Sequence, residues 1–214
     1  MPSSNDVSII ARTDLYVVVD KPCGLLSVPG KGPGKTDCVA ARVRQMFPRA
    51  AGPMIVHRLD MDTSGLIVVA LDADTQRSLS MQFEARSVEK SYVALVEGDV
   101  PGDSGRIDEP LRTDIANRPC QIIDHVHGRP AITDWRVLAR ETDRTRVEFM
   151  PRTGRTHQLR VHAAHRRGLG CPILGDRLYG DPDSAPRLML HAATLSFVDP
   201  AGRRRVEFTS HVPF

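Results

Sequence analysis

The loop at residues 56–66, VHRLDMDTSGL, joins two apolar segments, GPMIV (52–56) and LIVVAL (66–71), whose composition predicts strands. A tight hairpin between two strands needs little more than a glycine and an Asn or Asp. This connection carries a histidine, an arginine, two aspartates and two hydroxyl side chains. Arg58 and Asp60 are two residues apart, so in extended backbone both side chains leave on the same face. The loop alone fits two interpretations equally: an ionised catalytic carboxylate, or an exposed ion pair in a turn.

Composition indicates a folded protein. The chain has 214 residues, of which 41% are hydrophobic and 26% charged, so it can bury a core. No apolar run approaches the length of a membrane span, and the N-terminus lacks a secretory pattern. Four cysteines lie far apart without a C-x-x-C pair, which disfavours disulfides and metal knuckles. We therefore expect free thiols, which are typical of cytoplasmic proteins. His157, His162 and His165 lack the spacing of a zinc helix, so we expect no metal.

Positive charge is concentrated near the C-terminus. Residues 151–214 hold ten arginines and five acidic residues, for a net charge of +5. The other 150 residues hold nineteen basic and twenty-one acidic groups, for a net charge of −2. Arginine is suited to bidentate contacts with phosphate, so this gradient indicates a partner that carries phosphates.

The periodicity predicts a mixture in which strands outnumber helices. Helices are expected over DCVAARVRQMF (37–47), over 74–86 with Asp72 or Asp74 as N-cap, and over 153–168 with Thr153 or Thr156 near the start and Gly168 as C-cap. Strands are expected around 15–20, 53–56, 66–71, 90–98, 128–151 (two strands) and 189–210, where a hairpin turns at 199–202. Consecutive strands predict an α+β fold: a mixed, largely antiparallel sheet with flanking helices and loops.

The motifs HRLDMDTSG (57–65), KSYVALVEG (90–98) and PRTGRTHQLRVHAAHRRGLGCPILGDRLYG (151–180) occur in this order. Together they resemble the RluA-type pseudouridine synthases, and the resemblance runs from DKPCGLLSVPG (20–30) to RLMLHAATLSF (187–197). The resemblance implies the pseudouridine synthase fold and the isomerisation of specific uridines to pseudouridine in structured RNA. It implies no cofactor, because the reaction exchanges no electrons.

The resemblance also implies roles for individual residues. Asp60 becomes the catalytic carboxylate, as nucleophile at C1′ or as base at the ribose, and Arg58 enters the RNA stack. Tyr92 packs on the target base. Arg160 is the cationic partner of the aspartate, with Arg155 as the alternative. Further RNA contacts are expected from His57, Arg152 and Arg155, and pocket residues from Thr63, Ser64, Gly65 and Leu190.

The domain organisation follows from the same resemblance. Residues 1–214 are expected to form one catalytic domain in which residues 1–14 are an N-terminal extension, with no separate RNA-binding domain. The short members of the family act on tRNA anticodon stem-loops and on 23S ribosomal RNA, so these RNAs are the expected partners of a cytoplasmic monomer. Two other functions remain open. A non-catalytic RNA-binding protein would not need Asp60, and a glycosidase would need two opposed acids.

Overall fold

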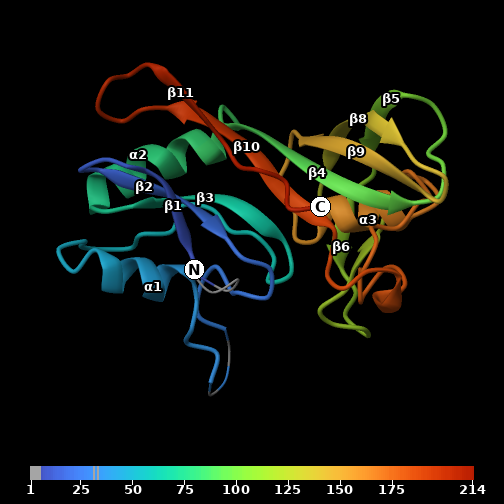
Figure 1. The fold of residues 1–214 in the computed structure, drawn as a ribbon, viewed down its shortest axis with the longest axis horizontal. Coiled ribbons are helices and arrows are strands. Elements are labelled where there is room, and N and C mark those ends of the chain that lie inside the picture. Colours follow the sequence, from blue (N-terminus) through green and yellow to red (C-terminus); the bar gives the residue numbers. More distant parts are fainter. Residues whose placement is uncertain (1–5, 31, 33) are drawn as a thin grey trace. The chain divides into compact units, whose positions relative to one another are not determined.

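The computed structural model describes residues 6–30, 32 and 34–214, and it divides the chain into two compact units. Unit 1 comprises Met1–Lys90 and Ala192–Pro213, and unit 2 comprises Ser91–His191 with Phe214. Figure 1 labels most of the helices and strands of both units.

Unit 1 is built on a sheet with the strand order β1 (Ser8–Arg12), β2 (Tyr16–Lys21), β3 (Ser64–Ala70), β10 (Leu190–Val198) and β11 (Arg205–Thr209). β2 is antiparallel to both β1 and β3, and β10 is antiparallel to β11 (Figure 1). The central strands are rich in β-branched residues and every residue of β3 is buried, so hydrophobic burial fixes their place inside the sheet.

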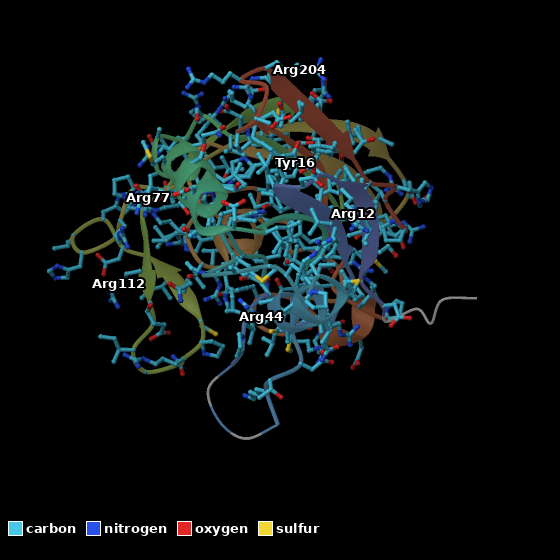
Figure 2. All side chains as sticks on the ribbon, turned by 90° about the vertical axis from the view of Figure 1, so that its left-hand side faces the viewer. Arg12, Tyr16, Arg44, Arg77, Arg112 and Arg204 are labelled. Carbon is cyan, nitrogen blue, oxygen red and sulfur yellow. The ribbon has the colours of Figure 1, made fainter. Side chains whose placement is uncertain are left out.

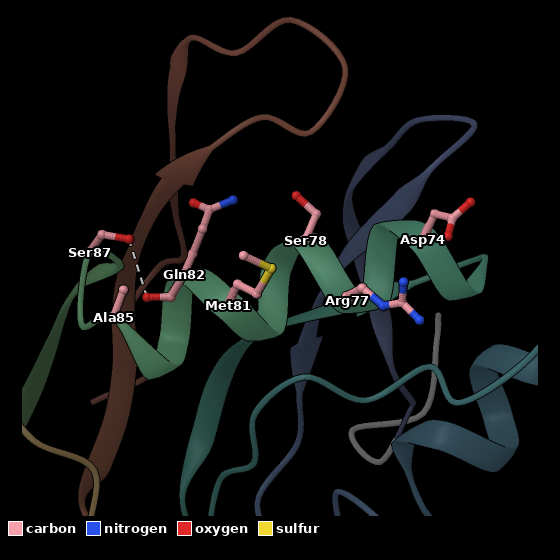
Figure 3. Close-up of a pocket in the computed structure, with 7 residues that line it drawn as sticks. All are labelled: Asp74, Arg77, Ser78, Met81, Gln82, Ala85 and Ser87. Carbon is pink, nitrogen blue, oxygen red and sulfur yellow. Dashed lines mark hydrogen bonds between the residues drawn. The ribbon is translucent and has the colours of Figure 1, made fainter.

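Two helices accompany this sheet, α1 (Val39–Met46) and α2 (Ala73–Glu84). Asp72 is the N-cap of α2, and its carboxylate accepts hydrogen bonds from the Thr75 amide at 2.8 Å and hydroxyl at 2.7 Å. Leu79 of α2 is fully buried against the sheet core. Gln82 exchanges two hydrogen bonds of 2.8 Å with the Val198 backbone, which ties α2 to β10. Figure 3 shows a hollow along α2 that is lined by exposed and half-buried side chains, Gln82 among them.

Unit 2 is built on the antiparallel strands β4 (Glu89–Glu97), β9 (Arg144–Pro151), β8 (Ile132–Arg140) and β5 (Ser104–Asp108), in that order. A separate hairpin consists of β6 (Leu111–Thr113) and β7 (Gln121–Ile123). The helix α3 (Gln158–Ala164) packs into the core of this unit, and a short 3₁₀ helix covers Pro182–Ser184. Among the described residues no helix has the length and apolar character of a membrane span.

The α+β fold class predicted from the sequence is confirmed, and so are the helices at 39–46 and 73–84 and the terminal hairpin. Asp72, rather than Asp74, caps α2. Within the expected N-terminal extension, Ser8–Arg12 forms β1, and residues 1–5 lie outside the described part of the chain.

The strand predicted at 53–56 is wrong. Only an isolated bridge joins Ile55 to Val69, and the amide of Ala70 donates to the carbonyl of Met54. Pro53 has no N–H to donate, and Gly52 adopts a positive φ of 78°, so the backbone cannot sustain a ladder here.

The predicted helix at 153–168 is much shorter than expected. α3 begins at Gln158 after an N-cap at His157, and it ends at Ala164 before a C-cap at His165, whose backbone is extended. Gly168 is therefore not the C-cap. Glycine is required at this position because the backbone comes close to that of His162, and a Cβ here would lie 1.8 Å from the His162 carbonyl oxygen.

Candidate active site

Asp60 lies in the loop of unit 1 that leads into β3, and its side chain is half-buried. The carbonyl of Asp60 accepts a hydrogen bond of 3.2 Å from the amide of Thr63, which closes a turn over Met61 and Asp62. Thr63 is buried, whereas Arg58 on the other side of Asp60 is exposed. The loop thus offers an accessible arginine and a partly sheltered carboxylate.

The segment that follows β2 holds this loop on both sides of Asp60. The Ser27 hydroxyl donates to the Leu59 carbonyl at 2.7 Å and accepts from the Leu59 amide at 3.0 Å. The Met61 carbonyl accepts hydrogen bonds from the Lys21 ammonium at 2.8 Å and from the Gly24 amide at 2.9 Å. The residues immediately before and after Asp60 are therefore fixed, which fixes the Cα of the carboxylate between them.

Lys21 is fully buried although it carries an ammonium group. In addition to the Met61 carbonyl, it donates to the carbonyls of Pro22 at 2.9 Å and Leu25 at 2.7 Å. An ammonium has three N–H donors, and three carbonyls accept from this one, which compensates for its removal from water. Lys21 thereby links the turn after β2 to the Asp60 loop.

Gly65 marks the point where the loop becomes β3. Its φ is +113°, a conformation that residues with a side chain rarely adopt. A Cβ at this position would lie 2.4 Å from the carbonyl oxygen of Ala192 on β10. Only glycine fits here, because the backbones of the two strands approach so closely.

The structure shows that His57 packs inside unit 1. Its ring stacks on Phe83 of α2 with a centroid distance of 4.5 Å, and its Nε2 accepts a hydrogen bond of 3.1 Å from the Val68 amide. Burial and the nearby Lys90 ammonium lower the pKa of His57 to about 3, so the ring is neutral at physiological pH. These contacts give His57 a structural function, and the RNA contact expected from the sequence stays a prediction.

Arg160 lies on α3 in unit 2 and is buried, with only 4% of its side chain exposed. Its Nε and Nη2 donate to the two carboxylate oxygens of Asp176, at 2.8 Å and 2.6 Å. This two-point ion pair was not expected from the sequence, in which Asp176 is one of five acidic residues in the arginine-rich segment 151–214.

Tyr92 and Leu190 also belong to unit 2. Tyr92 pairs with Phe149 in the β4–β9 ladder, and it packs against the hydrophobic cluster that contains Leu190 and Leu159. Leu159 directly precedes Arg160 on α3. The three residues that the resemblance assigns to unit 2, Tyr92, Arg160 and Leu190, are thus attached to one core.

Arg152 and Arg155 lie at the end of β9 and in the segment before α3. Arg152 donates to Asp134 at 2.7 Å. Hydrogen bonds from Arg106 and Arg152 lower the pKa of Asp134 to about 2, against the opposing effect of burial. Arg155 donates through Nε to the Pro130 carbonyl at 3.0 Å. Both arginines have partners within their unit, and their RNA contacts stay predictions.

The structure places the predicted site residues in two groups. Unit 1 holds His57, Arg58, Asp60, Thr63, Ser64 and Gly65, and unit 2 holds Tyr92, Arg152, Arg155, Arg160 and Leu190. Sequence reasoning missed Ser27, Lys21 and Asp176. A turn was expected at Lys21, but no local pattern reveals that its side chain reaches a carbonyl 40 residues away. In the described part of the chain, no three His, Cys, Asp or Glu side chains are arranged to hold a metal ion.

Comparison with known proteins gives a consistent result. The family model for RNA pseudouridylate synthase matches residues 15–165. The dual-specificity RNA pseudouridine synthase RluA of Escherichia coli K12 is 44% identical over 210 residues, covering 96% of this chain and 93% of the relative. The enzyme with the same name in Yersinia pestis is 45% identical over 211 residues, covering 96% of this chain and all of the relative.

Solved structures show the same fold. Human RNA pseudouridylate synthase domain containing 1 matches with a TM-score of 0.81 and 31% identity, covering 100% of this chain and 86% of the human chain. Human RNA pseudouridylate synthase domain containing 4 matches with a TM-score of 0.77 and 27% identity, covering 96% and 88%. With its HRLDMDTSG loop held in place around Asp60, this chain belongs to the RNA pseudouridylate synthase family and is an RluA-type pseudouridine synthase.

Proposed function

We propose that this synthase modifies uridines in a tRNA anticodon stem-loop and in 23S ribosomal RNA, acting as a cytoplasmic monomer with Asp60 as its catalytic carboxylate. The proposal of two RNA targets rests on the dual specificity in the names of relatives that are 44–45% identical to it, and the choice of tRNA and 23S ribosomal RNA rests on the family resemblance. The observation that supports Asp60 is its setting, because the backbone of both neighbours is held by the segment at 21–27.

The reaction requires the target base to leave the RNA helix. Isomerisation breaks the N1–C1′ bond of uridine and forms a C5–C1′ bond, after which C5 loses its proton and N1 gains one. The ribose carbon is inaccessible inside a stacked helix, so the nucleotide must flip into the enzyme at a cost of a few kcal/mol. Exposed Arg58, two residues before Asp60, offsets part of this cost by filling the space that the base leaves.

Asp60 acts at the ribose, either by attacking C1′ or by removing the C2′ proton, and both routes need an ionised carboxylate. A guanidinium stabilises this charge, and we assign that function to Arg160, with Arg155 as the alternative. Tyr92 supplies an aromatic face for the detached uracil. Leu190, Thr63, Ser64 and Gly65 complete the surroundings of the base.

Phosphate contacts come from exposed arginines in each unit. Arg203 and Arg204 lie in the β10–β11 turn of unit 1, and Arg166, Arg167 and Arg177 lie after α3 in unit 2. Figure 2 labels Arg204 together with Arg77 of α2, two of the exposed arginines of unit 1. Arginine forks fit phosphate oxygens, so these side chains suit an RNA backbone.

The test is tritium release from RNA labelled at C5 of uridine, with stoichiometric enzyme. Asp60→Asn keeps the size of the side chain and removes the carboxylate, so we expect RNA binding to persist and product formation to fall by at least about four orders of magnitude. Arg58→Ala should also slow the reaction, but an unstructured RNA should partly restore its rate because no stack has to be opened.

The outcomes separate the possible functions. Isomerisation releases the C5 hydrogen without releasing uracil, a glycosidase releases free uracil, and an RNA-binding protein releases neither. Tritium release by Asp60→Asn near the wild-type rate would refute the assignment of Asp60.

A further inference from the structure

Asp176 holds Arg160 by an edge of its guanidinium. Asp176 is 1% exposed and Arg160 is 3% exposed, so the ion pair lies inside unit 2. The pair is bidentate, with donor–acceptor distances of 2.8 Å from Nε and 2.6 Å from Nη2. A planar guanidinium held at two atoms cannot rotate, so its other N–H donors point in a fixed direction.

The turn that carries Asp176 is itself rigid. Its Oδ1 accepts hydrogen bonds from the amides of Leu178 at 2.9 Å and Tyr179 at 3.2 Å. Gly175, directly before it, has a φ of +72°, and a Cβ there would lie 2.0 Å from the Arg187 carbonyl oxygen. The backbone of this turn therefore fixes the orientation of the Asp176 carboxylate, and the carboxylate fixes the orientation of the Arg160 guanidinium.

Tyr179 holds Arg160 from another side. The Arg160 Cζ lies 5.2 Å from the centroid of the Tyr179 ring, within the range of a cation–π contact. The Tyr179 hydroxyl is held by the Gln121 amide at 2.8 Å and by Nδ1 of His157 at 2.8 Å. The guanidinium thus meets a carboxylate at one edge and an aromatic ring at one face.

Stability alone does not account for this arrangement. Burying an ion pair costs desolvation, and a well-packed apolar pair of the same volume is often at least as stable. What the ion pair supplies is a fixed direction for a buried cation. Catalysis is sensitive to such placement, since a displacement of about 1 Å can cost about a hundredfold in rate.

We propose that Asp176 and Tyr179 are positioning residues for the pseudouridine synthase reaction. They fix the guanidinium of Arg160 in the orientation in which it stabilises the charge of the catalytic carboxylate. The inference rests on the role proposed above for Arg160, and it predicts that Asp176 affects the reaction only through that arginine.

The experiment is a double-mutant cycle with Asp176→Asn, Arg160→Met and the double variant. Asparagine keeps an oxygen for the Leu178 and Tyr179 amides and loses the acceptor for Nε of Arg160. Single-turnover tritium release is measured at saturating RNA, RNA affinity is measured separately, and circular dichroism reports folding. The matched control is Asp181→Asn, because Asp181 is an exposed carboxylate that accepts from the Asp183 amide at 2.9 Å.

We expect Asp176→Asn to bind RNA within about threefold of wild type and to react at least about tenfold more slowly. The double variant should react no more slowly than Arg160→Met, because a misplaced arginine and an absent arginine are equivalent for the reaction. Asp181→Asn should match wild type.

A folded Asp176→Asn protein that reacts within twofold of wild type would overturn the proposal, and so would losses that multiply in the double variant. If Asp176→Asn does not fold, Tyr179→Leu and Tyr179→Phe replace it. Leucine removes the ring face and should slow the reaction, whereas phenylalanine keeps the ring and should be milder. Equal rates for these two variants would overturn the proposal.

The function and the inference fail in different ways. An active Asp60→Asn protein would refute the proposed function. A fully active Arg160→Met protein beside an inactive Asp60→Asn protein would refute only the role of Arg160 and its two positioning residues.

Discussion

The hydroxyl of Ser27 satisfies both backbone groups of Leu59, the residue before Asp60. Both Ser27 and Leu59 are buried, so water cannot replace this hydroxyl if it is removed. A side chain that is distant in sequence thus helps to fix the backbone next to Asp60.

Ser27→Ala should leave the N–H and C=O of Leu59 without this partner, at a cost of about 1–3 kcal/mol in the free energy of unfolding. We also expect turnover to fall by about tenfold or more at unchanged RNA affinity, because the loop loses its support on one side. Urea unfolding and single-turnover assays measure the two effects. Ser87→Ala is the control, since its exposed hydroxyl donates to the Gln82 carbonyl at 3.2 Å. Equal behaviour of the two variants would contradict the role of Ser27.

His57 should make the protein less stable in acid. Its pKa is about 3 in the folded protein and about 6.5 in the unfolded chain, so below pH 6.5 only the unfolded chain takes up this proton. Stability therefore falls as the pH drops from 6.5 towards 3. At pH 5 the loss attributable to His57 is at most about 2 kcal/mol, at about 1.4 kcal/mol per pH unit. Unfolding free energies at pH 5 and pH 7 should differ less in His57→Gln, which keeps an acceptor for Val68. Equal differences in both proteins would refute this explanation.

At the scale of elements, α2 depends on Asp72, the N-cap residue that precedes it. The Asp72 carboxylate accepts from the Thr75 amide, and this hydrogen bond is the largest cause of its lowered pKa. Asp74 lies in the first turn of the helix and is exposed.

Asp72→Ala should lower the free energy of unfolding by about 1 kcal/mol, because a helix N–H loses its acceptor. Asp74→Ala removes a similar charge from the same helix end without removing the cap, so about 0.3–0.5 kcal/mol is expected. Urea unfolding of both variants at pH 7 provides the comparison. A larger loss for Asp74→Ala would show that charge, rather than capping, stabilises this helix end.

At the scale of the whole molecule, arginine is unevenly distributed along the chain. Net charge is only +3, yet the last 64 residues carry ten arginines. Exposed members of this set occur in both units, so the RNA is expected to meet several cations at once.

RNA affinity should therefore fall steeply with salt. Each neutralised phosphate contributes a slope of about −0.7 to −0.9 to the plot of log affinity against log salt concentration. Several contacts predict at least a tenfold loss between low and physiological salt. Arg203→Gln combined with Arg204→Gln should reduce the slope by up to about two phosphate contacts. A binding constant that does not change with salt would contradict a phosphate-binding surface.

The sequence by itself determined which features are local or repeated. The β-branched runs of β2 and β3, a helix capped at Asp72 or Asp74 and the β10–β11 hairpin follow from periodicity and turn chemistry, which act over a few residues. The motifs around Asp60 determined the family. Where local rules compete, as at Pro53 in the predicted strand, the sequence reading failed, because a missing N–H outweighed an apolar pattern.

Only the tertiary structure decided what surrounds the functional residues. Ser27 and Lys21 contact the Asp60 loop at sequence separations of 32 and 40 residues. Asp176 contacts Arg160 at a sequence separation of 16 residues. Each contact joins a buried polar group to a partner, and burial obliges such groups to find partners wherever the fold places them. The identity of that partner depends on the packing of the strands and on the path of the turns. These are set by the whole chain, so no local pattern contains them.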